Sequence, residues 1–197
     1  METKLVLRRP VVVLLGAWNP AIFTPEWIAH FLFEYKDGDN VTIGMIQEVA
    51  SGEHIIFIDN IGISASTNRL KFFVWEENDI EKLPSVITKL YETLPHTPLG
   101  DFGVNYKFTV ESPNISIVES LETSEFLDME FAILRQEIKT QLGRDESSVI
   151  NLQRIFDGND FELDLNFHFS VTNAGEILEL VNAGICATCL AEAKKTY

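Results

Sequence analysis

Two cysteines near the end of the chain have the Cys-x-x-Cys spacing that thiol redox pairs and zinc sites use: Cys186 and Cys189. A redox pair gains reactivity at a helix N-terminus, where the helix dipole lowers the thiol pKa, but these cysteines fall well inside a predicted final helix. A zinc site needs two further ligands, and the sequence offers no second cysteine pair and no closely spaced histidines. We therefore predict that both thiols are core residues, packed beside Ala183, Gly184 and Ala187.

Other residues with chemical potential are also better explained without a reaction. Acids recur at every third position in one segment: Glu119, Glu122, Glu125 and Asp128. A helix would align these carboxylates for a divalent cation, yet no histidine joins them, and acids at a helix start are stabilised by the helix dipole. The histidines stand far apart in the sequence: His30, His54, His96 and His168. No glycine-rich phosphate loop follows a strand. We predict no catalytic residue, metal or cofactor, and a triad assembled from distant positions stays open.

A recognition surface is predicted from alternation along the segment 161–169. Apolar side chains at the odd positions point to one face, and polar side chains at the even positions point to the other. The turn at 157–160 sets Gln153 near Asp164 and Asn151 near Asn166. The predicted partner-binding residues are Asn105, Lys107, Asn151, Gln153, Asp164, Asn166 and His168. The alternative is an ordinary solvent face of a sheet. In either case this side should be polar, free of helices and low in bulky side chains.

The elements that position these residues follow from periodicity and from capping residues. Strands are predicted at 11–18, 41–49, 54–63, 69–75, 104–110, 148–156 and 161–171. A first helix begins at Thr24-Pro25-Glu26, and a second is capped by Asn78 or Asp79. A third runs from about Glu125 to Gly143. The last helix is capped by Thr172 or Asn173 and extends nearly to the final residue.

These elements predict an α+β fold with two layers, a mostly antiparallel sheet and about four helices packed on one face. The order strand, helix, strands, helix occurs twice, which suggests tandem β-α-β-β-α halves at about 1–99 and 100–197. No linker separates the halves, so residues 1–197 are expected to form a single compact domain.

Composition excludes several classes of function. The chain has 197 residues with 15 Lys and Arg against 30 Asp and Glu, a net charge of −15 that repels nucleic acids and anionic lipids. The basic and apolar N-terminus at 4–15 is too short for a secretory signal, and no stretch has the length of a membrane span. Two cysteines give no disulfide framework, which favours the cytoplasm. The charge suits a basic protein partner, and the oligomeric state stays open.

The leading hypothesis is a non-enzymatic protein-interaction module, an accessory or inhibitory subunit of a cytoplasmic complex. The second is a small-ligand binder or an enzyme without a visible motif, with a pocket between sheet and helices. Aromatic residues would line that pocket: Trp18, Phe57, Phe72 and Tyr106. The third is an acidic mimic of nucleic acid, although the acids are interspersed with Lys and Arg.

Overall fold

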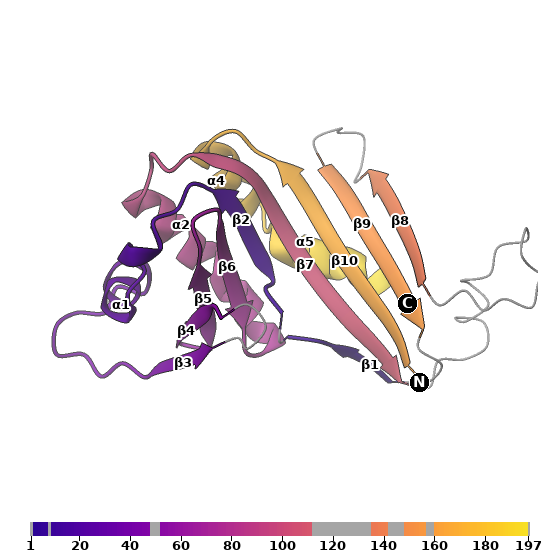
Figure 1. Ribbon diagram of the computed structural model, residues 1–197, viewed down its shortest axis with the longest axis horizontal. Coiled ribbons are helices and arrows are strands. Elements are labelled where there is room, and N and C mark those ends of the chain that lie inside the picture. Colours follow the sequence, from indigo (N-terminus) through magenta and orange to yellow (C-terminus); the bar gives the residue numbers. More distant parts are fainter. Residues whose placement is uncertain are drawn as a thin grey trace, which may run out of the picture.

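The fold is a single antiparallel sheet with helices packed behind it (Figure 1). The computed structural model describes residues 2–7, 9–47, 52–111, 135–141, 148–156 and 160–196. The strands are β1 (Glu2–Leu5), β2 (Val12–Gly16), β3 (Ile43–Gln47), β4 (His54–Ile58), β5 (Ile61–Ala65), β6 (Arg69–Val74), β7 (Leu99–Glu111), β8 (Arg135–Gln141), β9 (Ser148–Phe156) and β10 (Asp160–Ser170). The helices are α1 (Pro25–Leu32), α2 (Leu83–Thr93), α4 (Ala174–Asn182) and α5 (Ile185–Ala193), with short 3-10 turns η1 (Pro20–Ile22), η2 (Glu77–Lys82) and η3 (Lys194–Thr196). The predicted α+β class is confirmed.

Strand order makes β2 and β7 the centre of the sheet. The strands lie side by side as β3-β4-β5-β6-β2-β7-β10-β9-β8, and every described pair is antiparallel. Strand β1 also pairs with β7, beyond the position where β2 stops. Strands β1 and β2 share one edge of β7. On its β2 side, β6 therefore pairs with β2 from Arg69 to Phe72, and no described strand pairs with Phe73 and Val74 on that side.

Residues of β10 alternate between the core and the opposite face of the sheet, as the sequence predicts. Its odd positions from Phe161 to Phe169 are buried, and its even positions from Glu162 to His168 are half-buried. The buried residues join a core that includes Phe72, Phe102, Tyr106, Phe108 and Phe167. Helices α2, α4 and α5 lie behind the sheet in Figure 1, and core residues of α2 and α4 pack against this apolar face.

The helix starts follow the capping rules. Thr24 Oγ1 accepts a hydrogen bond from Trp27 N at 3.2 Å, and Pro25 occupies the first position of α1. Asp79 and Glu76 form a reciprocal capping box at η2, which leads into α2. Asn173 caps α4 through Glu176 N at 3.1 Å. These caps confirm the predicted starts of α1 and α4. The predicted cap of the second helix at Asn78 or Asp79 is wrong, because Glu76 is the N-cap of η2 and α2 itself begins at Leu83.

Three predicted elements are wrong. The segment 54–63 is two strands, because Asp59 and Asn60 adopt positive φ and close a tight turn between β4 and β5. Residues 135–141 of the predicted third helix form β8, whose pairing with β9 overrides the local helical spacing. The remaining residues of that helix lie outside the described part of the chain. The last helix is broken at Gly184, whose φ of 74° is left-handed, so α4 and α5 meet at 60°.

Candidate functional site

Six of the seven predicted recognition residues lie in one register across three strands, and we call all seven the polar strip. Asn166 faces Asn105 on β7 and Asn151 on β9, and Asp164 faces Lys107 and Gln153 in the same way. His168 follows on β10 with Gly103 as its neighbour on β7. All members of the strip are half-buried. The side chains therefore share the helix-free face, as predicted from alternation.

Amide groups of the polar strip bind one another. Asn151 Nδ2 donates to Asn166 Oδ1 at 3.0 Å, and Asn166 Nδ2 donates to Asn105 Oδ1 at 2.7 Å. This ladder ties β9, β10 and β7 together across the face. Asn166, the inner asparagine, thus uses one donor and its acceptor oxygen in the ladder, whereas Asn151 uses only its nitrogen and Asn105 only its oxygen there.

Charges on the strip are paired with residues that the sequence did not reveal. Arg9 Nη1 lies 2.7 Å from Asp164 Oδ2 and Lys107 Nζ lies 2.7 Å from Glu162 Oε2. His168 Nε2 lies 3.2 Å from Asp101 Oδ1. The partners of Asp164 and His168 were missed because they depend on how β7, β10 and the N-terminal segment assemble, and no local spacing signals that assembly.

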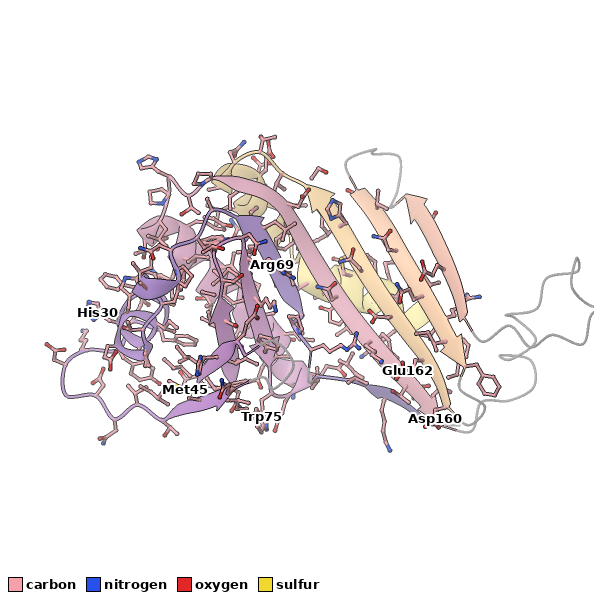
Figure 2. The ribbon with its side chains drawn as sticks, in the orientation of Figure 1. His30, Met45, Arg69, Trp75, Asp160 and Glu162 are labelled. Carbon is pink, nitrogen blue, oxygen red and sulfur yellow. The ribbon has the colours of Figure 1, made fainter. Side chains whose placement is uncertain are left out.

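A second feature of the same face is an apolar groove of about 820 Å³. It opens where β1 and the end of β6 separate, and Figure 2 shows Trp75 at this end of β6. The groove is lined by Lys4, Leu5, Val6, Leu7, Ile46, Ile55, Phe57, Phe73, Val74, Trp75 and Thr109. Phe73 and Ile55 are buried, whereas Trp75 is 58% exposed. The groove thus combines a packed floor with an exposed indole at its side.

Strand register places the groove on the helix-free face. Val13 pairs with Gly103 on one side and Lys71 on the other, so Lys71 shares the face of His168. Phe73 lies two residues beyond Lys71 and therefore points the same way. The prediction of a polar face low in bulky side chains is wrong for this half of the sheet, because Ile55 and Phe57 on β4 and Phe73 on β6 lie on it.

Glycine makes room for the aromatic pair in the groove. A Cβ at Gly62 would lie 2.6 Å from Phe57 Cε1 and 2.9 Å from Ile55 Cγ2, so the Phe57 ring covers the bare backbone of β5. The rings of Phe57 and Trp75 meet edge to face with centroids 5.4 Å apart. Trp75 therefore packs on Phe57 at the side of the groove.

The cysteine pair is part of the core, although its predicted position in the helix was wrong. Gly184 begins a new helix, which places Cys186 in the first turn of α5. Both side chains are nonetheless buried, and burial raises the pKa of each thiol to about 12. Tyr106 Oη donates to the carbonyl oxygen of Cys186 at 2.8 Å, which fixes α5 to β7. The thiols are protonated and shielded at neutral pH.

The other candidate groups give no metal or catalytic cluster in the described ranges. No group of three or more His, Cys, Asp or Glu could hold a metal ion there. The acids of the segment 119–128 lie outside the described residues. His30 Nδ1 lies 3.1 Å from the carbonyl oxygen of Tyr35.

Of the aromatics proposed for an internal pocket, Phe57 lines the apolar groove and Trp18 lines a smaller cavity of about 340 Å³. The other two, Phe72 and Tyr106, are core residues.

Comparisons with known proteins add nothing to this geometry. Within the described residues no single helix has the length and composition to cross a membrane, and the bent pair of α4 and α5 reaches that composition only when the two are taken together. Neither a protein-family model nor a curated protein nor a solved structure matches the chain.

Proposed function

We propose that the protein is a non-enzymatic interaction module, an accessory or inhibitory subunit that binds a partner protein on the helix-free face of its sheet. One observation carries the proposal: an exposed tryptophan, Trp75, lines the side of an apolar groove of about 820 Å³. Trp residues dominate binding energy when they fill or border desolvated pockets. Trp75 is 58% exposed beside this apolar surface, and exposed apolar patches of this kind mark interaction sites.

The polar strip is proposed as the rim of this interface. Its ion pairs and its amide ladder leave it with nearly balanced charge, so it suits hydrogen bonding more than strong electrostatic attraction. The net charge of −15 acts over a longer range and favours encounter with a partner whose surface is basic. The groove supplies affinity, and the strip fixes orientation.

A photocrosslinking experiment tests the proposed interface. Trp75→p-benzoylphenylalanine places the probe at the groove, and Phe31→p-benzoylphenylalanine is a matched control on α1, where the native ring is 42% exposed. We expect the groove probe alone to capture one defined protein in the host. That protein, once purified, should bind the wild-type chain and lose about 30-fold in affinity to Trp75→Ala, as for a hot spot of about 2 kcal/mol. Equal capture by both probes contradicts the proposal.

Small-ligand binding is a second candidate, favoured by the volume of the groove. Ligand sites commonly enclose roughly 300–1,000 Å³ of mostly apolar space, and the groove lies within that range. Native mass spectrometry of the chain purified from its host distinguishes the two: a retained small molecule, displaced in Phe73→Ala, favours the ligand. An acidic nucleic-acid mimic fits less well, because Asp164 of the polar strip is paired with Arg9 and the neighbouring Glu162 with Lys107.

Tandem halves and a cytoplasmic location are also proposed. Strands β4, β5 and β6 form a meander that ends beside β2, and β8, β9 and β10 form one that ends beside β7. Helix α2 follows the first meander and α4 the second, and the two helices contact each other. This order supports a repeat with β2 and β7 at its centre. The free thiols of both cysteines fit a reducing compartment.

A further inference from the structure

Strand β3 has the features of a docking edge. It ends the strand order and pairs, among the described strands, with β4 alone. Ile43, Met45 and Ile46 are 43%, 58% and 44% exposed, although each is a large apolar residue. An edge strand with exposed apolar side chains presents unpaired N–H and C=O groups that invite another strand.

The opposite edge of the same sheet provides an internal comparison. Strand β8 has the sequence RQEIKTQ, in which three of seven residues are charged. Charged residues on an edge strand are a common protection against unwanted pairing. Strand β3 has the sequence IGMIQ and carries no charge. One edge is thus protected by charge and the other is not, which is the pattern expected if β3 receives a strand.

The surroundings of β3 favour a basic occupant. The segment that leads into it carries Asp37 and Asp39, both exposed, against a single Lys36, while its Glu34 is already paired with Lys89 at 3.0 Å. Asp59 is exposed in the turn between β4 and β5. A second copy of the chain would bring another net charge of −15 to this edge, whereas a lysine-rich segment would bring opposite charge.

Gly44 leaves space for a side chain of the incoming strand. Among the described residues, only Phe57 Cβ lies within 4 Å of the position of a Cβ at Gly44, at 3.5 Å. Ile46 lies on the same face and lines the apolar groove. An apolar side chain opposite Gly44 would therefore lie next to Phe57, and its neighbour two residues along would lie next to Ile46.

We infer that β3 binds an extended segment of the partner, with alternating apolar and basic residues, as an additional antiparallel or parallel strand. The inference rests on the proposed interaction function and specifies how the partner binds. Main-chain hydrogen bonds to β3 supply affinity, and the apolar side chains of the segment pack beside Phe57 and Ile46.

Synthetic peptides test this inference on the full chain. The probe is a seven-residue peptide in which valine alternates with lysine. Two further versions carry N-methyl groups on all valines or on all lysines. Alternate residues of a strand direct their N–H groups to opposite edges. We expect one N-methylated version to lose at least 10-fold in affinity and the other to retain it, because only one set of N–H groups faces β3. Amide exchange should slow at 43–47 when the unmodified peptide binds.

Matched variants locate the binding. Met45→Lys should weaken the peptide about 10-fold, whereas Thr140→Lys, which adds the same charge at an exposed position of β8, should have little effect. Equal binding of both N-methylated versions, absent protection at 43–47, or no binding of any peptide overturns the inference. A dimer that Met45→Lys dissociates also overturns it, since the occupant would be a second copy. None of these results bears on the capture of a partner at Trp75, so failure here is distinguishable from failure of the proposed function.

Discussion

Gly62 on β5 is the position where the packing of the groove can be tested most sharply. The substitution Gly62→Ala adds a methyl group that meets Phe57 Cε1 at 2.6 Å, Phe57 Cζ at 2.7 Å and Ile55 Cγ2 at 2.9 Å. These distances are too short for carbon atoms, so the Phe57 ring must leave its place. Overpacking of this kind costs about 1–3 kcal/mol. We expect that loss in urea unfolding followed by tryptophan fluorescence, with an unchanged m-value.

Two controls separate this cause from a general effect of the substitution. Gly100→Ala adds the same methyl group at a position with no described atom within 4 Å, and the free energy of unfolding should stay within about 0.5 kcal/mol of wild type. In a Phe57→Ala background, Gly62→Ala should cost at least about 1 kcal/mol less than it does alone, because the clashing ring is absent. If the two substitutions are additive, or if Gly62→Ala alone is neutral, the packing of Phe57 on Gly62 is not as described.

Three further predictions concern the strip, the thiols and the first helix. Asn166→Ala removes both hydrogen bonds of the amide ladder and should cost about 1–3 kcal/mol in the free energy of unfolding. Asn182→Ala, at the exposed end of α4, should cost about 0.5 kcal/mol or less. Equal losses in the two variants would contradict the ladder. Burial raises the pKa of the Cys186 and Cys189 thiols from 9.0 to about 12, so the unfolded chain loses these protons at lower pH than the folded chain. The free energy of unfolding should therefore fall as pH rises from about 9 to 12. The double variant Cys186→Ala, Cys189→Ala should flatten that slope. A slope unchanged in the double variant would assign the effect to other groups. Thr24→Ala should cost about 0.5–2 kcal/mol through loss of the α1 cap, measured by urea unfolding, with Thr67→Ala at another exposed position as the neutral comparison.

Alternation and capping patterns in the sequence predict an element correctly where its packing in the fold requires the same pattern. Period-two alternation identifies β10 and its polar side, because one face of that strand packs on the core and the other meets solvent. The start of α1 follows from Thr24 and Pro25, which act within one turn. These features depend on neighbours in the sequence and therefore need no knowledge of the fold.

Features that depend on distant segments were not predictable in this way. The spacing of apolar residues around Ile138 predicts a helix, but this segment forms β8 and pairs with β9. Local propensity does not encode such pairing. The groove depends on β1 and β2 dividing one edge of β7, and on the bare backbone at Gly62 that admits Phe57. Arg9 donates a hydrogen bond to Asp164, which lies 155 positions away in the sequence. Each of these requires the strand order before the contact can be inferred.

Amide exchange in the complex with the captured partner tests the central claim most directly. Binding on the helix-free face should slow exchange in β1, β4 and the end of β6, which line the groove around Trp75. Exchange in α2, α4 and α5 should stay as in the free chain. Protection confined to these helices, with none along the groove, would contradict the account.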